Sequence, residues 1–216
     1  MVDFTLWDIL RNLLLAARWT LVLSMIAFVG GGVGGILLLV LRLSRVPAAA
    51  AIVRGVVQVF QGTPLLMQLF LAYFGIALLG VDVSPWVAAT AALTLYSSAF
   101  LAEIWRGCVE GVPRGQWEAA DALALSFPQK LRDVILPQAL RTAVPPTVGF
   151  LVQVVKGTAL ASIIGFVEVT KAGQVIVNAT FRPFTVYGFV ALTYFALCFP
   201  ITWASRRLER RLNGSR

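Results

Sequence analysis

The chain has 216 residues, of which 59% are hydrophobic and 13% are charged, and its formal net charge is +8. This composition excludes an ordinary soluble domain and predicts an integral membrane protein. Because its apolar runs are long and lack the alternation of barrel strands, we expect an all-α membrane fold.

Five apolar stretches approach the ~20 residues that a helix needs to span the hydrocarbon core of a bilayer. We therefore treat residues 1–216 as one transmembrane domain with five helices, at about residues 19–41, 56–79, 86–105, 143–166 and 185–204. Most of the 18 Lys and Arg residues, Arg45 and Arg216 among them, fall on one side of these spans. Since flanking positive charge is retained in the cytoplasm, we predict an outside N-terminus and an inside C-terminus. The positive charge then requires no nucleic-acid partner.

The first span has two further features. Met1-Val2-Asp3 lacks the basic region of a cleavable signal peptide, so we expect the first span to be retained. The amphipathic residues 6–17 before it either lie in the membrane interface or extend the first span. Glycines at 30–35 have GxxxG spacing, which favours close helix packing against another helix of this chain or of a second subunit.

Polar side chains within spans are costly in lipid and tend to face a cavity or a partner. The candidates for a substrate pathway are Gln61, Thr63, Gln68, Gln153, Lys156 and Thr158. Pro64 and Gly157 mark places where helices can be interrupted, which frees backbone groups to meet a polar ligand. Lys156 suits a substrate carboxylate, or alternatively pairs with an acid or carbonyl elsewhere. Glu103 is expected to form a helical ion pair with Arg106, three residues on.

A polar segment, Gly111 to Pro137, interrupts the apolar sequence and lies within a predicted cytoplasmic loop at about residues 107–141. Pro113 can open a first helix there, and Ser126 with Gln129 makes a capping box that starts a second. Pro137 is expected to limit or kink the far end of the second helix. We therefore predict two short helices meeting at an elbow, a shape suited to docking in a groove of a cytoplasmic partner.

The remaining segments carry fewer signals. Residues 168–183 are predicted to form a short helix on the external face, with polar side chains at Glu168, Lys171, Gln174, Asn178 and Arg182. The C-terminal arginines are expected to bind the anionic lipid surface. Cys108 and Cys198 have no metal-ligand spacing, so we expect both thiols to be free and no metal site.

Catalysis finds little support in this sequence. Histidine is absent, which excludes Ser-His triads and most general-base schemes. Lys156-Gly157-Thr158 has the wrong order for a phosphate-binding loop and lacks its glycine-rich approach. We therefore expect no enzyme activity and no cofactor in this chain, and an energy input from another chain or an ion gradient.

Five motifs in order along the chain point to one family: FQGTPLLMQLF at 60–70, YSSAFLAEIWRG at 96–107, VPRGQ at 112–116, VILPQALR at 134–141 and KGTALAS at 156–162. Glu118-Ala119-Ala120 also stand at the spacing from Leu136-Pro137 that defines the EAA motif. With these residues the chain resembles the permease subunits of ATP-binding-cassette (ABC) importers for polar amino acids. It departs from the family pattern with Ala124 for Gly, Val134 for Ile, Gln61 for Arg, and Gly157 for an acidic or amide residue.

The resemblance implies a location in the bacterial inner membrane and a subunit that pairs with itself or a sister permease. Two ATPase subunits, which hold the ATP and Mg, would grip the EAA loop through Glu118, Ala119, Ala120, Asp121, Ala124, Ser126, Leu136 and Pro137. Glu118 can also be explained as a charge favoured by the helix dipole. A periplasmic amino acid binding protein would dock on the external helix, which alternatively only covers the pore. Two other classes remain open: a secondary transporter or channel, and a membrane-anchored scaffold.

Overall fold

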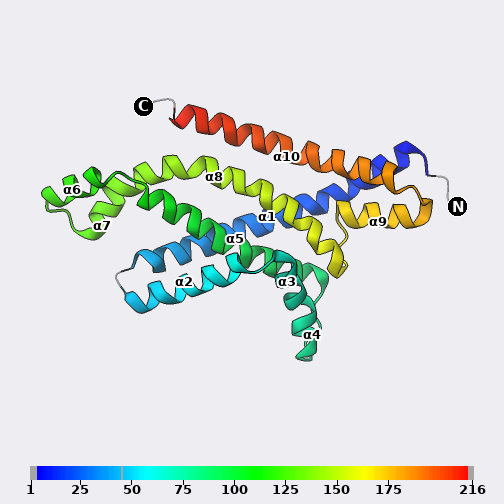
Figure 1. The fold of residues 1–216 in the computed structure, drawn as a ribbon, viewed down its shortest axis with the longest axis horizontal. Coiled ribbons are helices and arrows are strands. Elements are labelled where there is room, and N and C mark those ends of the chain that lie inside the picture. The colour runs from blue at the N-terminus through cyan, green and yellow to red at the C-terminus, as the bar shows by residue number, and fades with distance from the viewer. Residues whose placement is uncertain (1–3, 45, 214–216) are drawn as a thin grey trace.

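The computed structural model describes residues 4–44 and 46–213. Met1-Val2-Asp3, Arg45 and Arg216, on which parts of the sequence analysis rest, lie outside the described residues. The described residues form an elongated bundle of helices (Figure 1). Helices α6 (Arg114–Ala122) and α7 (Phe127–Gln129) lie at one end of the bundle, and α9 (Val169–Thr180) lies beside the start of α1 at the other (Figure 1).

Helix α1 (Leu6–Leu43) is one continuous helix of 38 residues. Residues 6–17 therefore extend the first span and form no separate interfacial helix. A capping box starts α1: the Thr5 backbone N–H donates to Asp8 Oδ2 at 3.0 Å, and the Asp8 N–H donates to Thr5 Oγ1 at 3.2 Å.

The second predicted span is broken. Helix α2 (Pro47–Gly62) is bent by 102° relative to the following helical segment Leu65–Leu78. That segment comprises α3 (Leu65–Phe70), the π-helical turn η1 (Leu71–Gly75) and α4 (Ile76–Leu78). The break falls at Thr63-Pro64, because proline has no N–H to donate and disfavours helical backbone in the residue before it. The prediction of one span over 56–79 was thus wrong in its bounds, and the predicted interruption at Pro64 is confirmed.

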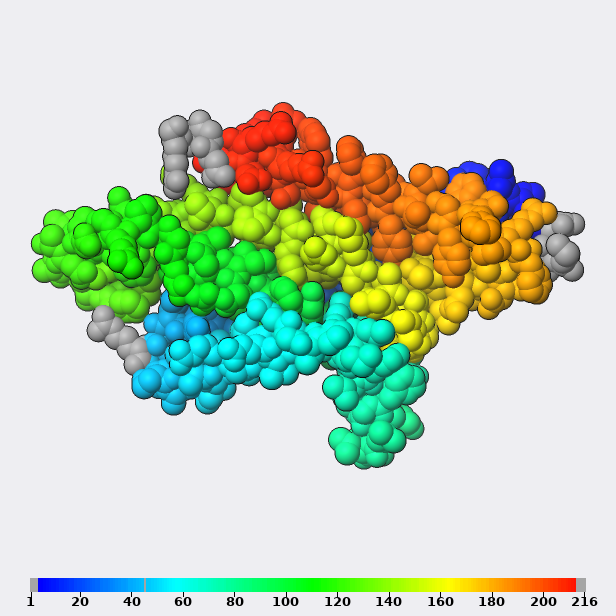
Figure 2. All heavy atoms as spheres, viewed as in Figure 1, coloured from blue at the N-terminus to red at the C-terminus, as the bar shows by residue number. Residues whose placement is uncertain are grey.

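The segment Leu65–Leu78 projects sideways from the bundle (Figures 1 and 2). Its outer end is exposed and apolar, with Leu78 at 88% and the following Leu79 at 82% of full exposure. Helix α5 (Pro85–Glu110) then runs from the middle of the bundle to the loop end (Figure 1).

The polar loop contains one short helix, α6 (Arg114–Ala122), and the start of a long one. The long helical unit Phe127–Ile164 runs through α7 (Phe127–Gln129), the π-helical turn η2 (Lys130–Ile135), α8 (Leu136–Gly157) and the 3-10 segment η3 (Thr158–Ile164). The prediction of two short helices was therefore wrong for the second. Pro137 does not end it, because the wider π turn directly before the proline accommodates its missing N–H.

Helix α9 (Val169–Thr180) leads into α10 (Pro183–Asn213), which packs along α8. Among residues 4–44 and 46–213, four helical units are long and apolar enough to cross a membrane, and the bent pair of α2 with Leu65–Leu78 makes a fifth when it is counted as one span. The predicted all-α fold is confirmed, and the four to five candidate membrane spans agree with the predicted number.

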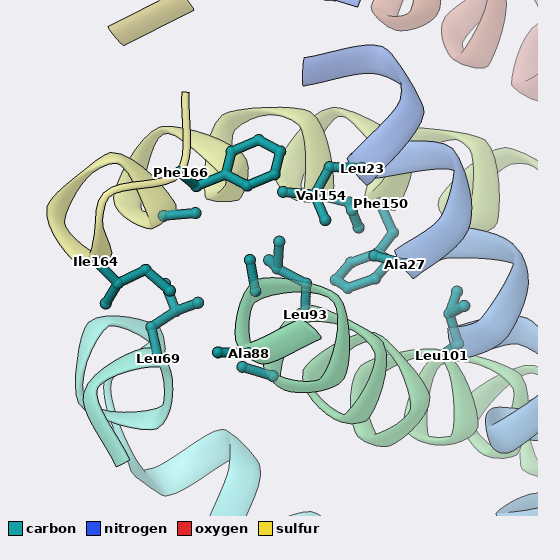
Figure 3. Close-up of a cluster of buried hydrophobic side chains, with 13 residues drawn as sticks. Leu23, Ala27, Leu69, Ala88, Leu93, Leu101, Phe150, Val154, Ile164 and Phe166 are labelled. Atoms are coloured by element: carbon teal, nitrogen blue, oxygen red, sulfur yellow. The ribbon is translucent and has the colours of Figure 1, made fainter. Parts of the chain in front are cut away.

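The core is built on helices α1 and α5, which form the most extensive helix pair of the bundle. Gly31 and Gly34 are the closest points. A Cβ added at Gly31 would lie 2.3 Å from Ser97 Cβ, and one at Gly34 would lie 2.2 Å from Ser98 Oγ. The GxxxG glycines thus serve packing, and their partner is a helix of the same chain. Beside this pair, Leu69, Leu93 and Phe166 are fully or almost fully buried in the main apolar cluster (Figure 3).

Candidate transport site and coupling loop

The break between α2 and α3 is held by one side chain. Gln68 Nε2 donates to the carbonyl oxygen of Phe60 at 2.9 Å, to that of Thr63 at 3.1 Å, and to Thr63 Oγ1 at 3.0 Å. It thereby satisfies carbonyl groups that the end of α2 leaves without helical partners. Thr63 and Gln68 were predicted to line a pathway, and the structure brings them together with each other, with Gln68 buried and Thr63 exposed.

A second break lies directly beside the first. Helix α8 changes at Gly157 into the 3-10 segment η3, where Thr158 is fully buried and its hydroxyl donates to the Val155 carbonyl oxygen at 2.7 Å. A Cβ added at Gly157 would lie 3.1 Å from Leu65 Cδ2, at the start of α3. The two predicted interruptions, at Pro64 and Gly157, are therefore neighbours in space. Gln153 is exposed, one helical turn before Gly157.

Gln61 lies on the other side of the first break, where it lines a cavity of about 280 Å³ between α1, α2 and α5. Glu103 and Arg106 form part of its wall, and Arg106 Nε donates to Glu103 Oε2 at 2.9 Å. The predicted ion pair between these two residues is confirmed, and Arg106 also pairs with Glu110. The lining of this cavity is therefore rich in polar and charged side chains.

Lys156 lies apart from these residues. Its side chain lines a groove of about 350 Å³ between α8 and α10, together with Tyr194, Cys198 and Trp203. Within the described part of the chain, the Lys156 ammonium group makes no ion pair or hydrogen bond. Because α10 lies on the opposite flank of the bundle from α2, the structure does not bring Lys156 together with Gln61 (Figure 1). Both cysteines are free thiols.

The three EAA residues of α6 differ in their exposure to solvent. Glu118 and Ala119 are exposed, whereas Ala120 is 1% exposed and packs inward. Helix α6 ends in a Schellman motif, in which the Leu125 N–H donates to the Ala120 carbonyl oxygen at 3.2 Å. Ala124 occupies the left-handed position of this motif, at φ +51°. This backbone conformation favours glycine, which explains the Gly of the family pattern.

The elbow after Ala124 is capped as predicted. The Ser126 backbone N–H donates to Gln129 Oε1 at 2.9 Å, and the Ser126 hydroxyl donates to the same oxygen at 2.6 Å. These bonds satisfy donors at the start of the long helical unit.

Three contacts fix α6 to that long helical unit. Asp121 of α6 forms an ion pair with Lys130, which is buried, and Gln138 Nε2 donates to Gln116 Oε1 at 3.1 Å. The third contact is made by Trp117 of α6, which packs against an apolar cluster of buried residues, Val109, Val112, Ile135 and Ala139. Leu136 is half-buried beside this cluster and Pro137 is exposed. Helix α6 is therefore joined through a packed base to the unit that ends beside the breaks.

At the opposite end of the molecule, Glu168 has a structural role. Its side chain is fully buried, accepts a hydrogen bond from the Lys171 N–H at 2.9 Å at the start of α9, and accepts another from the Tyr194 hydroxyl. Lys171 is half-buried, whereas Asn178 and Arg182 are exposed. Sequence reasoning missed Tyr194, because no local pattern indicates a bond between residues 26 positions apart on different helices.

Comparison with known proteins agrees with this architecture. The family described as "Binding-protein-dependent transport system inner membrane component" matches residues 31–214. A probable amino-acid ABC transporter permease of Bacillus subtilis (strain 168) is 32% identical over 208 residues, covering 92% of each chain. The glutamine transport system permease of Escherichia coli (strain K12) is 34% identical over 209 residues, covering 96% of this chain and 95% of the relative.

Two solved structures have the same fold. A chain from the crystal structure of an amino acid ABC transporter with histidines is 30% identical and has a TM-score of 0.92, covering 98% of this chain and 99% of its own. A chain of the MetNI methionine ABC transporter in an inward-facing conformation has a TM-score of 0.70 with the same coverage. At 24% identity, the second comparison bears on the fold alone.

Proposed function

The chain belongs to the family of binding-protein-dependent transport system inner membrane components, and from this premise we propose that it couples ATP hydrolysis to the import of a polar amino acid. It is a multi-pass inner-membrane protein and the permease component of an amino acid ABC importer. ATP hydrolysis belongs to partner subunits, which hold the ATP and Mg. We further assign the residues that contact the ATPase subunits and the residues that line the path of the transported amino acid.

One observation carries the coupling proposal: a single helical unit, Phe127–Ile164, connects the EAA loop to the two breaks. With the EAA loop on the cytoplasmic side of the membrane, the two ATPase subunits of the complete importer contact the exposed face of α6 at Glu118 and Ala119. Because Asp121 and Lys130 tie α6 to the long unit, a displacement of α6 is transmitted along α8 to Gly157. The elbow of this connection is formed by Ala124 and Ser126, and its base includes Leu136 and Pro137.

The coupling proposal is tested by Glu118→Lys in the reconstituted importer. Glu118 is exposed, so the reversed charge leaves the membrane fold intact and weakens the contact with the ATPase subunit. We expect ATP hydrolysis to continue while uptake falls at least about tenfold, equivalent to ~1.4 kcal/mol. Glu209→Lys is the matched control, because Glu209 is exposed on α10, which is not part of the loop. Equal coupling in the two variants would contradict the role of Glu118.

The pathway proposal rests on the two adjacent breaks. Interrupted helices place backbone groups and polar side chains near the middle of the bilayer, where transporters hold their cargo. We assign Gln61, Thr63 and Gln153, which are exposed, to the surface facing a second permease subunit, with Gln68 and Thr158 shaping the breaks beneath. The second permease is either another copy or a sister chain.

We also assign Lys156 to the pathway, because its unpaired ammonium group can bind the carboxylate of the transported amino acid. Lys156→Met is expected to lower the affinity for cargo or the rate of uptake. Unchanged affinity and rate would restrict Lys156 to the groove between α8 and α10.

On the external side, we propose that a periplasmic amino acid binding protein docks near Lys171, Asn178 and Arg182. Glu168 supports this surface from below, because its carboxylate is buried and caps α9. Arg182→Glu should weaken stimulation of the ATPase by the loaded binding protein. Stimulation equal to that of the unchanged protein would place the docking surface elsewhere.

The competing proposal is a transporter driven by an ion gradient. It predicts uptake by this chain in vesicles that lack ATP, the ATPase and the binding protein. Uptake that requires all three supports the importer, and uptake that persists without ATP would contradict it.

A further inference from the structure

An apolar groove of about 520 Å³ lies between the last turns of α1, the end of α5 and the start of the long helical unit Phe127–Ile164. No charged residue of the described chain lines it. Its polar side-chain donors are already engaged: the Ser44 hydroxyl donates to the Leu41 carbonyl oxygen at 2.7 Å, and the Trp105 indole N–H donates to Thr147 Oγ1 at 2.8 Å. The groove therefore offers a ligand mainly apolar contacts.

The edges of this groove are exposed on helices that can cross the membrane. Val40 of α1 and Leu140 of α8 line the groove and are 61% and 64% exposed, whereas Val109, Ala139 and Ala143 form its buried floor. All three walls belong to helical units long and apolar enough to span the hydrocarbon core. An alkyl chain of the surrounding lipid can therefore enter the groove from the side.

The π-helical turn η2 places a cation beside the groove. Leu131 and Leu136 both line the groove, although five residues in a regular α-helix would separate their directions by about 140°. The wider π turn brings them to one side. Arg132 is four residues before Leu136, so it projects from nearly the same side. Its side chain is 89% exposed, and its one ion pair within the described chain joins Arg132 Nε to the adjacent Asp133 Oδ1 at 3.9 Å.

We propose that this groove binds one anionic phospholipid. An acyl chain fills the apolar groove, and the lipid phosphate accepts hydrogen bonds from the Arg132 guanidinium group, whose planar donors match phosphate oxygens. Basic positions beside grooves between transmembrane helices bind anionic head groups in this way. Only the leaflet rests on the proposed function: with the EAA loop in the cytoplasm, the lipid belongs to the cytoplasmic leaflet.

The chemistry of the groove favours a phospholipid over a soluble ligand. A polar amino acid or a free phosphate ion would leave its hydrogen-bonding groups without partners against the apolar walls, which is costly. A phospholipid instead meets the apolar walls with its chain and the single cation with its head group. The bound chain would contact Leu136 and Ala139, so it would also lie against the base that joins α6 to the long helical unit.

The head-group contact is tested by native mass spectrometry of the permease–ATPase complex in mild detergent. The complex is titrated with phosphatidylglycerol and with phosphatidylcholine carrying the same chains. Saturable binding of one phosphatidylglycerol per permease copy is expected. Arg132→Gln should weaken that binding at least about fivefold, the effect of one basic side chain at an anionic surface, and should leave phosphatidylcholine binding unchanged.

Arg141→Gln is the matched control for Arg132→Gln. Arg141 is exposed on the same helical unit, and it follows Leu136 by five α-helical residues, so it projects about 140° away from it. The control should bind phosphatidylglycerol as the unchanged protein does. Equal affinities of the two variants for phosphatidylglycerol would overturn the assignment of the anionic lipid to Arg132.

The groove itself is tested by blocking it. Val40→Trp adds bulk at an exposed edge and should reduce the binding of both lipids, whereas Val33→Trp should not. Val33 is 59% exposed two turns earlier on the same face of α1 and does not line the groove. Equal lipid binding by these two variants would overturn the site.

The occupant is identified with a phosphatidylglycerol that carries a photoactivatable group on its acyl chain. Adducts are expected within residues 36–43 and 127–143. Cross-links from these residues to a second permease or an ATPase subunit in place of lipid adducts would mean that protein covers the groove, and would overturn the proposal. All of these measurements are made without cargo or ATP, so a failure of ATP-driven import would contradict the proposed function and leave the lipid site standing.

Discussion

The close pair α1–α5 and the pair of interrupted elements at Pro64 and Gly157 are built in opposite ways. Helices α1 and α5 are continuous and meet through glycine and serine with little side-chain volume between them. The interrupted elements meet through a leucine beside a glycine, and their freed backbone groups are bound by Gln68 and Thr158.

This difference shows how a membrane protein separates rigidity from function. Lipid provides no hydrophobic force between helices, so close van der Waals packing along small residues must hold the bundle together. A break in a helix is tolerated only where other groups satisfy the backbone, and such places are suited to polar cargo. Replacements in the α1–α5 pair should therefore destabilise the protein through steric overlap, and replacements at the interrupted elements through lost hydrogen bonds.

The largest effect is expected at the close pair, with Gly31→Leu. The first side-chain atom alone would lie 2.3 Å from Ser97 Cβ and 3.1 Å from the Ser97 backbone, so the helices must separate. We expect a loss of about 3 kcal/mol or more, the upper range for overpacking, seen as a low folded yield and a reduced Tm in detergent. Gly55→Leu is the control, since a Cβ at Gly55 would meet nothing within 4 Å. Equal losses would mean that the two glycines do not differ in packing.

A smaller effect is expected at the first break, with Gln68→Met. Methionine keeps the length of the side chain and removes the donor that serves the Phe60 and Thr63 oxygens. Leaving such groups without partners costs about 1–3 kcal/mol, so Tm should fall and the orientation of α3 should loosen. Gln174→Met on the exposed face of α9 should leave Tm unchanged. Hydrogen exchange confined to residues 60–68 would locate the effect, and protection equal to that of the unchanged protein would contradict it.

The next effect lies just beyond the second break, with Tyr194→Phe. The change removes a hydroxyl that donates to the buried Glu168 carboxylate and leaves the Lys171 N–H as its donor. A hydrogen bond to a charged group contributes about 1.5–3 kcal/mol, and partial rearrangement should reduce the loss to the lower value. Tyr187→Phe serves as the control because Tyr187 is 42% exposed. A Tm equal in both variants would show that Glu168 does not depend on Tyr194.

Sequence reasoning succeeded where structure depends on a few adjacent residues. The capping box at Ser126, the ion pair of Glu103 with Arg106 and the interruption at Pro64 were all predictable from spacing alone. It failed where the outcome depends on a neighbouring helix or on backbone adjustment. Nothing adjacent to Pro137 indicates that a π turn will carry the helix through it.

Local sequence patterns also could not predict on which side of the bundle each polar side chain lies. Lys156 and Gln61 are both polar residues within spans, and only the arrangement of α2, α8 and α10 puts them on opposite flanks. Glu168 looks like a surface residue in the sequence, and its burial follows from the position of Tyr194 on α10. The candidate site could be predicted by residue type, and its division into separate surfaces could not.

The smallest effect is expected at a third interruption, the elbow of the EAA loop, and it has the opposite sign. Ala124 has φ +51°, a left-handed conformation that costs a residue with a Cβ about 1–2 kcal/mol. Ala124→Gly removes this strain, while the greater freedom of glycine in the unfolded chain offsets part of the gain. We therefore expect a net stabilisation of about 0.5–1 kcal/mol and a rise in Tm of about 1–4 °C.

The control for Ala124→Gly is the same replacement inside the neighbouring helix. Ala119 is exposed within α6, where glycine costs about 1 kcal/mol relative to alanine, so Ala119→Gly should lower Tm. A fall in Tm for both variants would mean that the elbow is not strained. Opposite signs would show that an interruption can be stabilised by relieving its backbone, a route that the continuous pair α1–α5 does not offer.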